Sequence, residues 1–258
     1  MEFIDQLHRT LSLQTTPCRI ISLVPSQTEL LVDLGLRNRI VGITKFCVHP
    51  VDLRSEKLIV GGTKKVNLKK IKSLNPDIII CNKEENTEEM VLELEKIAPV
   101  WISDVNTIQE SIQMIEALGE IFRVPGKATE VATAIASELQ MFRDFVENKP
   151  LRKALYLIWK DPFMAAGRDT FINSLLKINN FENVIQEPTS RYPEVNIELF
   201  EEADIIFLST EPYPFKEEHV LKLQKKVDIE VILVDGEYFS WYGSRLKNAF
   251  SYFKTLHH

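Results

Sequence analysis

Residues 127–149, KATEVATAIASELQMFRDFVENK, lie near the middle of the 258-residue chain and contain neither glycine nor proline. Their apolar residues follow the spacing of one helix face, at Val131, Ile135, Leu139, Phe142 and Val146. Pro125-Gly126 is expected to stop the chain before this stretch, and Pro150 after it. At about 1.5 Å per residue, such a helix is about 35 Å long. We therefore predict a long helical spine between two lobes.

Short apolar runs rich in β-branched residues flank this helix and alternate with stretches of helical periodicity. The runs are Ile20 to Val24, Ile40 to Ile43, Asp77 to Cys81, Val100 to Ile102, Ala154 to Ile158, Asp204 to Leu208 and Glu230 to Val234. Continuous apolar strands separated by helices are typical of parallel sheets covered on both faces. The sequence therefore predicts an α/β fold, with an N-terminal lobe at 1–124, a connecting helix at 125–149 and a C-terminal lobe at 150–258.

A weak internal repeat supports two lobes of similar design. Asn67-Leu68-Lys69-Lys70-Ile71 precedes Pro76-Asp77-Ile78-Ile79-Ile80, and Asn196-Ile197-Glu198-Leu199-Phe200 precedes Asp204-Ile205-Ile206-Phe207. Each copy predicts a short helix opening on asparagine, then a turn and a strand that starts with aspartate. The two asparagines lie 196 − 67 = 129 residues apart, which is half of the chain.

The first predicted strand leads directly into a helix. Ser26 and Glu29 have the spacing of a capping box, and Gly35 can end the helix in the left-handed conformation. This unit is either an ordinary strand–helix pair or one wall of a ligand cleft, because open α/β sheets bind ligands at the carboxyl ends of their strands.

Composition excludes several classes of protein. The chain has 31 basic and 37 acidic residues, a net charge of −6, and no long basic run, so nucleic acid and anionic membranes are not expected as partners. Cys18, Cys47 and Cys81 form no close pair, which excludes a disulfide framework and a four-thiolate zinc site. No stretch reaches about 18 apolar residues, so nothing is expected to span a membrane.

Catalytic signatures are largely missing, since no Gly-rich dinucleotide loop, P-loop, nucleophile elbow or zinc-protease helix is present. One candidate metal-ligating pair is Cys47 and His49, in the segment Lys45 to Pro50 that follows the second strand. The alternative is that these residues are structural or line an ordinary pocket.

Aromatic residues gather in the presumed loops of the C-terminal half. Trp159, Phe163 and Tyr192 lie near strand ends, and the segment 235–245 after the last strand contains Trp241 and Tyr242. Core packing accounts for many such residues, but a wide cleft for a large, flat ligand also favours them. Arg245 in the same segment can meet an anionic group of a ligand or remain a solvated surface residue.

Several segments, in collinear order from about residue 19 to 255, resemble the ABC-transporter substrate-binding proteins for cobalamin and iron-siderophores. The matching segments are Arg19 to Leu30, Val41 to Thr44, His49-Pro50, Gly61-Gly62, Asn67 to Ile71, Asn75 to Ile79, Phe163 to Phe171, Asn180 to Val184 and Tyr192 to Asn196. The cobalamin-binding branch looks closest.

The resemblance implies two Rossmann-like lobes with central parallel sheets, joined by a single long rigid α-helix, with ligand held between them. It implies that Glu88 and Glu198 dock onto arginines of permease subunits. It places pocket residues less securely at Phe46, Trp159, Phe163, Tyr192 and the loop around Trp241. Where the cobalamin binders have an aromatic residue before the Asn67 helix, this chain has Thr63-Lys64, which leaves room for a more anionic ligand.

Our leading hypothesis is a monomeric, non-enzymatic solute-binding component of an ABC uptake system, with no intrinsic cofactor. It would bind a cobalt- or iron-containing chelate, a corrinoid first and a ferric siderophore or haem second. The expected ligand-binding residues are Phe46, Cys47, His49, Trp159, Phe163, Tyr192, Trp241, Tyr242 and Arg245. The alternative is a cytoplasmic metal- or tetrapyrrole-handling enzyme on the same scaffold, using Cys47 and His49.

The start of the chain conflicts with transport. It lacks the basic and continuous apolar regions of a secretory signal, so the sequence as written predicts a cytoplasmic protein. The resemblance instead implies the periplasm or cell envelope. A trimmed start, a misassigned start codon and a cytoplasmic member of the family all stay open.

Overall fold

A computed structural model of the chain describes residues 1–186 and 190–257. The chain forms two compact units. Unit 1 comprises Met1–Val105, Gln109–Ser137 and Tyr242–Lys247, and unit 2 comprises Asn106–Ile108, Glu138–Trp241 and the chain from Asn248 onward. The lobe boundaries expected at 1–124, 125–149 and 150–258 stay a proposal, because the compact units do not follow single cuts in the chain.

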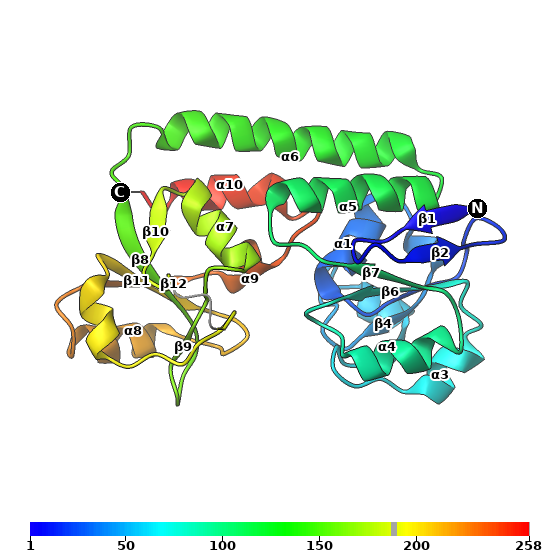
Figure 1. Ribbon diagram of the computed structural model, residues 1–258, viewed down its shortest axis with the longest axis horizontal. Coiled ribbons are helices and arrows are strands. Elements are labelled where there is room, and N and C mark those ends of the chain that lie inside the picture. Colours follow the sequence, from blue (N-terminus) through cyan, green and yellow to red (C-terminus); the bar gives the residue numbers. More distant parts are fainter. Residues whose placement is uncertain (187–189, 258) are drawn as a thin grey trace. The chain divides into compact units, whose positions relative to one another are not determined.

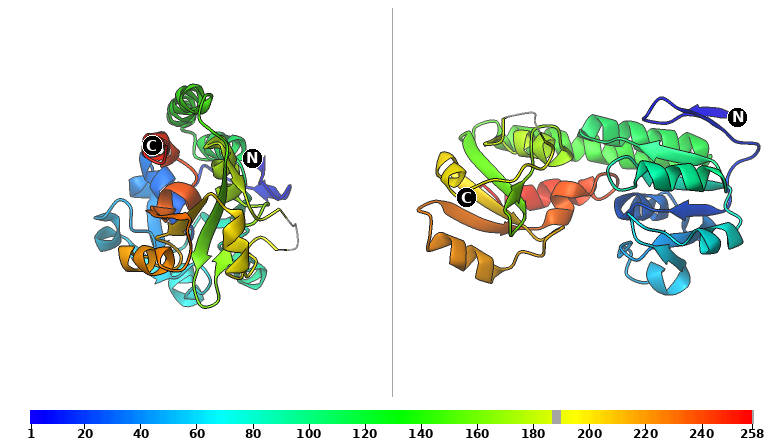
Figure 2. Two further views of the ribbon diagram at one scale, coloured as in Figure 1. Left: turned by 90° about the vertical axis from the view of Figure 1, so that its left-hand side faces the viewer. Right: turned by 60° about the horizontal axis from the view of Figure 1, so that its bottom comes forward.

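Unit 1 is built on a parallel sheet (Figure 1). Its strands lie in the order β5 (Leu58–Gly61), β4 (Ile40–Thr44), β3 (Ile20–Ser22), β6 (Ile78–Asn82) and β7 (Val100–Ser103). Its helices are α1 (Pro25–Asp33), η1 (Arg37–Arg39), α2 (Leu53–Glu56), α3 (Leu68–Ser73), α4 (Glu88–Glu95) and α5 (Ile108–Ile121). An antiparallel hairpin of β1 (Glu2–Ile4) and β2 (Thr10–Ser12) precedes the sheet in the chain (Figure 2).

The sheet of unit 1 is covered on both faces, as continuous apolar strands require. On one face, Ile79 and Cys81 of β6 pack against Ile71 of α3 and Leu94 of α4. Helix α5 lies on the opposite face (Figure 1). This double cover explains why β6 is fully buried and carries almost no polar side chain before Asn82.

Unit 2 has a sheet of the same kind. Parallel strands lie in the order β10 (Phe181–Asn183), β8 (Arg152–Trp159), β11 (Ile205–Ser209) and β12 (Glu230–Val234), and β9 (Met164–Ala165) pairs antiparallel with β8. The helices are α7 (Phe171–Ile178), η2 (Glu198–Glu202), α8 (Glu217–Gln224), α9 (Gly236–Ser240) and α10 (Leu246–Lys254). The prediction of an α/β fold with two parallel sheets is confirmed.

The core of unit 2 is rich in aromatic residues. Tyr156 on β8 and Phe207 on β11 contact Phe239 of α9, at ring-centroid distances of 4.9 and 6.1 Å. Phe239 in turn lies 4.8 Å from Phe253 of α10. Rings of this size bury a large apolar area and stabilise each other through tilted contacts.

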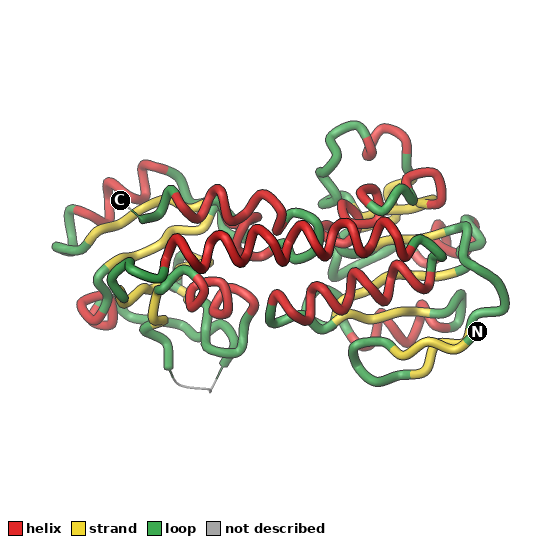
Figure 3. The backbone as a smooth tube through the Cα atoms, turned by 90° about the horizontal axis from the view of Figure 1, so that it is seen from above, coloured by secondary structure: helices red, strands yellow, loops and turns green. Residues whose placement is uncertain are grey.

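The long mid-chain helix is α6, Pro125–Val146, an unbroken helix in Figure 3. The expectation that Pro125-Gly126 stops the chain is wrong, because Pro125 starts the helix. The first helical position suits proline, since its missing N–H has no helical partner there. Val131, Ile135, Phe142 and Val146 of the expected stripe are buried, whereas Leu139 is half-buried. Among the described residues, no helix has the length and apolarity needed to cross a bilayer.

The internal repeat has a structural counterpart. Asn67 Oδ1 accepts the amide of Lys70 at 3.0 Å, and Asn196 Oδ1 accepts the amide of Leu199 at 3.3 Å. Each asparagine therefore satisfies one free N–H at the start of a helix.

The two aspartates of the repeat also act alike. Asp77 Oδ2 accepts the amide of Arg19 at 2.9 Å, and Asp204 Oδ2 accepts the amide of Lys153 at 2.7 Å. In both sheets, the aspartate before β6 or β11 thus holds the amino end of the neighbouring strand, β3 or β8.

Candidate functional site

The first strand–helix unit of the site differs from its predicted form. Helix α1 begins at Pro25 with Val24 as its N-cap, so Ser26 lies inside the helix, and no side chain caps it. The capping box is therefore wrong. The predicted end of the helix is confirmed, since Gly35 follows it with φ of +80°.

Glu29 instead forms an ion pair with Arg245. The guanidinium Nε and Nη2 each lie 2.9 Å from one carboxylate oxygen, and the side chains are only 11% and 20% exposed. Such a bidentate, partly desolvated pair is among the stronger polar contacts in proteins. It holds segment 242–247 on α1, within unit 1.

The segment after β4 divides into a buried and an exposed part. Cys47 is fully buried, and its Sγ lies 3.1 Å from Thr28 Oγ1 and 3.2 Å from Thr44 Oγ1. Burial raises the pKa of the Cys47 thiol, so it stays protonated at neutral pH. Phe46 is 48% exposed, with Lys45 Nζ 4.8 Å from the centre of its ring.

His49 is half-buried and precedes a cis peptide bond to Pro50. In the described part of the chain, no three His, Cys, Asp or Glu side chains come together as a metal site. The role of Cys47 and His49 in ligand binding stays a proposal.

A buried polar network lies at the carboxyl ends of β6 and β7. Gln27 Nε2 donates to Ser103 Oγ at 2.5 Å and to the hydroxyl of Tyr242 at 3.2 Å. Asn82 Nδ2 donates to the same Ser103 Oγ at 2.9 Å. Burial raises the pKa of Tyr242, so its phenol remains neutral. The network fixes Tyr242 within unit 1 and limits the surface that it can offer to a ligand.

Asn82 also orders the loop after β6. Its Oδ1 accepts the amides of Glu84 and Glu85 at 2.8 and 3.0 Å, and its own amide donates to Asn86 Oδ1 at 2.9 Å. Asn86 Nδ2 donates to the carbonyl of Thr63 at 2.8 Å. The loop at 83–87 is thereby tied to the loop after β5.

The loop after β5 contains Thr63-Lys64, at the place where the cobalamin binders have an aromatic residue. Lys64 Nζ donates to the carbonyl of Glu84. Glu85 lies in the same region, and burial raises the pKa of its carboxyl, with a smaller opposing contribution from Lys64. Lys45, Lys64 and Lys65 are exposed, so the loops after β4 and β5 present positive charge, next to the exposed Glu84 of the loop after β6.

In unit 2, the predicted aromatic residues lie around the carboxyl end of β8. Trp159, the last residue of β8, is 41% exposed and makes an edge contact with Tyr213 at 5.5 Å. Phe163 is half-buried and packs edge-on against Phe200 at 5.3 Å. Tyr192 is also half-buried. Trp159 therefore keeps a large exposed surface, whereas Phe163 packs partly against the core.

Trp241 and Tyr242 are neighbours in sequence but are held in different units. Trp241 is 8% exposed, and its Nε1 donates to Glu211 Oε1 at 3.0 Å. Ser240 Oγ contacts the same carboxylate oxygen. Glu211 thus holds Trp241 within unit 2, as Gln27 holds Tyr242 within unit 1.

The predicted site residues therefore fall into two groups. Unit 1 brings Phe46, Cys47, His49, Tyr242 and Arg245 to its sheet, and unit 2 brings Trp159, Phe163, Tyr192 and Trp241 to its own. Sequence reasoning missed Gln27, Asn82 and Glu211. One available signal was a polar residue that ends an otherwise apolar strand, as in Ile-Ile-Ile-Cys-Asn82.

Glu88 and Glu198 are both exposed. Glu88 is the first residue of α4, and Glu198 is the first residue of η2. Helix α4 precedes β7, the edge strand of its sheet, whereas η2 precedes β11, an inner strand of the other sheet, so the two glutamates do not occupy equivalent places in the repeat. Permease docking was expected at both residues, and it stays a proposal.

The profile of one protein family matches residues 20–237, most of the chain. The family is described as periplasmic binding protein. The chain belongs to this family. Its members are substrate-binding proteins and not enzymes, which confirms the expectation of a binding protein and removes the enzyme alternative.

Curated relatives agree with this assignment. The chain is 25% identical over 193 residues to the ABC transporter substrate-binding lipoprotein YvrC of Bacillus subtilis, covering 72% of this chain and 61% of that protein. It is 26% identical over 196 residues to the vitamin B12-binding protein of Vibrio cholerae, covering 74% of this chain and 70% of that protein. The alignment thus spans less than two thirds of the Bacillus protein.

Solved structures share the fold. The periplasmic vitamin B12 binding protein BtuF of Vibrio cholerae superimposes with a TM-score of 0.79 at 21% identity, over 93% of this chain and 96% of that chain. A periplasmic haem binding protein of Pseudomonas aeruginosa gives 0.81 at 18% identity, over 93% and 92%. CeuE of Helicobacter pylori with Ni(II) bound gives 0.85 at 16% identity, over 100% and 89%.

Proposed function

We propose that this protein is the solute-binding component of an ABC uptake system and that its ligand is a metal chelate. A corrinoid is the first candidate, and a ferric siderophore or haem is the second. The observation that carries the proposal is the family match over residues 20–237, together with relatives that are named for vitamin B12 binding.

Exposed aromatic residues at strand carboxyl ends support a large, flat ligand. Phe46 follows β4 in unit 1, and Trp159 ends β8 in unit 2, with 48% and 41% of their surfaces exposed. Open parallel sheets bind ligands at this edge. Ring faces give rigid contact area to a corrin or porphyrin without loss of side-chain freedom.

Positive charge beside Phe46 supports a ligand with anionic groups. Lys45 lies over the Phe46 ring, and Lys64 and Lys65 are exposed on the loop after β5. Carboxylate-bearing chelates suit such lysines better than a neutral corrinoid does. Haem and an anionic siderophore should therefore be tested together with cobalamin.

The direct test titrates cyanocobalamin, haemin and a ferric catecholate siderophore into the purified protein. Absorbance reports the chelate, and tryptophan fluorescence reports Trp159 and Trp241 together with the buried Trp101. We expect saturable, stoichiometric binding of one of the three at micromolar concentration. Absence of binding by all three would refute the ligand class.

Matched variants locate the ligand surface. Phe46→Ala and Trp159→Ala should each weaken binding about tenfold or more, since each ring would lose most of its contact with the chelate. Leu58→Ala and Leu151→Ala are the controls, because Leu58 starts β5 and Leu151 precedes β8 at the opposite ends of the sheets, with 42% and 63% exposure. The controls should bind as the parent does.

We further propose that Glu88 and Glu198 dock onto basic residues of the permease subunits. Both carboxylates are exposed, and within the described residues neither has a hydrogen-bond or ion-pair partner. Glu88→Lys and Glu198→Lys should each reduce uptake strongly and leave ligand affinity unchanged. Glu116→Lys and Glu182→Lys, at exposed positions elsewhere on the two units, should preserve uptake. Equal losses in all four variants would contradict docking at these two sites.

A further inference from the structure

The N-terminal hairpin has no part in the proposed function. It precedes residue 20, where the family match begins, and it attaches to the outer edge of β7. The amide of Gln6 donates to the carbonyl of Ile102 at 3.2 Å, and Asp5 Oδ2 accepts the amide of Ile102 at 3.4 Å. The hairpin turn therefore takes the place of a further strand beside the carboxyl half of β7.

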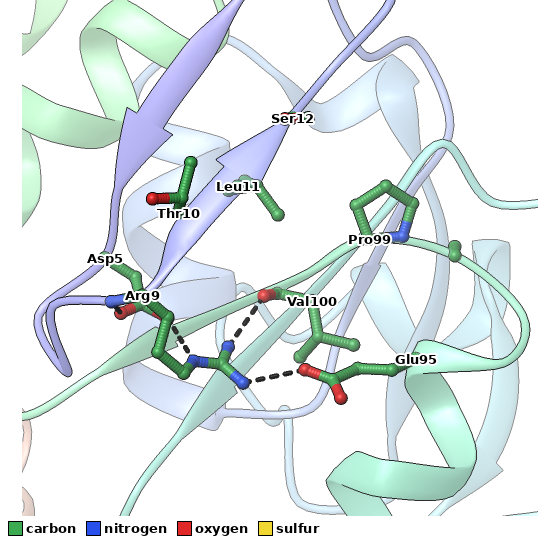
Figure 4. Close-up of a pocket in the computed structure, with 9 residues that line it drawn as sticks. Asp5, Arg9, Thr10, Leu11, Ser12, Glu95, Pro99 and Val100 are labelled. Atoms are coloured by element: carbon green, nitrogen blue, oxygen red, sulfur yellow. Dashed lines mark hydrogen bonds and ion pairs between the residues drawn. The ribbon is translucent and has the colours of Figure 1, made fainter.

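A groove of about 270 Å³ opens where this attachment ends (Figure 4). Residues 10–12 of β2 form one wall, and residues 98–100 at the amino end of β7 form the other. Arg9 and Glu95 also line it, joined by an ion pair of 2.7 Å. The groove lies at the amino ends of the strands, so it is separate from the ligand edge.

The register of the hairpin leaves the backbone of β2 unpaired on its outer side. Asp5 and Arg9 are a hydrogen-bonded pair at 3.0 Å, and Met1 and Leu13 are another at 2.9 Å. Because such pairs alternate in antiparallel ladders, the N–H and C=O groups of Thr10 and Ser12 point away from β1. Both residues are exposed and line the groove.

The opposite wall also presents backbone. The amide of Ile79 donates to the carbonyl of Pro99 at 2.9 Å, so Val100, the next residue, directs its own N–H and C=O away from β6. Its carbonyl accepts Arg9 Nη2 at 2.9 Å. Within the described residues, no group accepts the Val100 amide.

Among the described residues, the ion pairs and hydrogen bonds in the groove use both carboxylate oxygens of Asp5 but only one of Glu95. Asp5 Oδ1 accepts the amides of Leu7 and Arg9, and Oδ2 accepts Arg9 Nε at 2.8 Å. Arg9 Nη1 occupies Glu95 Oε1. With two carboxylates and one guanidinium, the groove has a net negative charge, and Glu95 is 41% exposed at its side chain.

We propose that this groove is a docking site for an extended, basic segment of a partner protein. The segment adds as a strand to the outer edge of β2, where Thr10 and Ser12 offer alternating donors and acceptors, and a lysine or arginine side chain pairs with Glu95. Strand addition of this kind takes affinity from backbone hydrogen bonds and selectivity from alternate side chains.

Two observations favour a strand over a small molecule. Natural edge strands are often blocked by lysine, proline or a bulge, and the three-residue strand β2 carries none of these, since its backbone groups that point away from β1 belong to the small, neutral Thr10 and Ser12. In addition, the volume of about 270 Å³ lies just below the usual range of small-molecule pockets, and both walls present backbone groups.

The test uses the full chain, labelled with ¹⁵N, and a capped pentapeptide of sequence Val-Thr-Lys-Val-Thr. We expect amide shifts concentrated at Thr10, Ser12 and Val100. The same peptide with glutamate in place of lysine should bind about two- to fivefold more weakly, as expected for loss of one exposed ion pair. Shifts elsewhere, or none at millimolar peptide, overturn the proposal.

Proline variants test the strand geometry. Ser12→Pro removes an outward N–H without removing a hairpin bond, and it should weaken peptide binding about fivefold or more. Ile4→Pro is the matched control, since its N–H points outward from the other edge of the hairpin. Equal effects of the two prolines overturn the proposal.

Two further measurements keep the outcome decisive. If Ser12→Pro unfolds the hairpin, Glu95→Gln serves instead and should abolish the preference for the lysine peptide. Loss of the Thr10 and Ser12 signals with rising protein concentration, in the absence of peptide, would assign the edge to a second copy of this chain and overturn the partner proposed here.

Discussion

The two sheets follow the same strand order but end in different chemistry. Strands β3, β4, β6 and β7 of unit 1 correspond to β8, β10, β11 and β12 of unit 2, and the described part of unit 2 has no counterpart of β5. At the carboxyl edge, unit 1 is organised by amide and hydroxyl hydrogen bonds around Gln27 and Ser103. Unit 2 combines hydrogen bonds around Glu211 with ring contacts, such as that of Trp159 with Tyr213.

This difference shows how one topology can supply two kinds of binding surface. Hydrogen bonds to buried groups are directional, so the unit 1 edge is held in one arrangement. Ring contacts are less directional, so the unit 2 edge can adjust to ligands of different outline. Polar substitutions should therefore cost more in unit 1 than at the equivalent places in unit 2.

The largest loss of stability is expected at the carboxyl ends of the corresponding strands β6 and β11. Asn82→Ala removes the bonds to Ser103 and the bonds that order the amides of Glu84 and Glu85, so we expect a loss of about 3 kcal/mol in the free energy of unfolding. Ser209→Ala should lose less, about 2 kcal/mol, because Ser209 orders a single following residue, Glu211, and accepts one bond from the buried hydroxyl of Tyr156. Urea unfolding measures the stability of both variants, and equal losses would contradict the difference expected between the two units.

The segment that returns to unit 1 provides the second contrast. Arg245→Ala removes a bidentate pair with Glu29 that is only 11% and 20% exposed, and should destabilise the protein by about 2 kcal/mol. Lys247→Ala removes a more exposed pair with Asp33, 3.3 Å long, and should cost at most about 0.5 kcal/mol. Raising the salt concentration should lower the cost of Lys247→Ala more than that of Arg245→Ala and so widen this gap slightly, because the Arg245 pair is shielded from solvent ions.

Two buried tyrosines, one in each unit, should also differ in how much their hydroxyls stabilise the fold. Tyr242→Phe leaves the Gln27 amide with fewer partners and should cost about 1.5 kcal/mol. Tyr156→Phe should cost about 0.5 kcal/mol, because Ser209 Oγ keeps its bond to the carbonyl of Glu211 at 2.6 Å. Thermal unfolding of the two variants should show the larger drop in midpoint for Tyr242→Phe.

The smallest effect is expected from Glu85 and depends on pH. Burial raises the pKa of Glu85 above its ordinary value, so the folded state holds the proton more tightly than the unfolded state. Its contribution to stability therefore falls as pH rises from the ordinary value through the raised one. Glu85→Gln should match the parent at low pH and be slightly more stable at pH 7. Glu89→Gln, exposed on α4, controls for the lost charge.

The strands that sequence predicts well are those buried on both faces. The runs at 78–82 and 205–209 are continuous and largely apolar, and each forms an inner strand of its sheet. β10 (Phe181–Asn183) was missed because it is a three-residue edge strand with an exposed glutamate in the middle. A strand this short has too little hydrophobic pattern to be told from a loop.

Site residues were harder to predict because their partners are distant in sequence. The capping pattern at Ser26 and Glu29 is local, but Pro25 starts the helix earlier and Glu29 pairs with Arg245, 216 residues away. In the same way, the hydroxyls of Thr28 and Thr44 enclose Cys47, which nothing in the Lys45 to Pro50 segment indicates.

The return of Tyr242–Lys247 to unit 1 has a consequence for synthesis on the ribosome. Three contacts of unit 1 need this late segment. Gln27 bonds to the hydroxyl of Tyr242, and Ser111 Oγ accepts the amide of Gly243. Glu29 pairs with Arg245. Although domains generally fold from the N-terminus as they emerge, unit 1 cannot complete these contacts until nearly the whole chain has been translated. While unit 2 is being translated, Gln27, Glu29 and Ser111 of the nascent unit 1 therefore remain without these partners. This is the period in which unit 1 depends most on a chaperone.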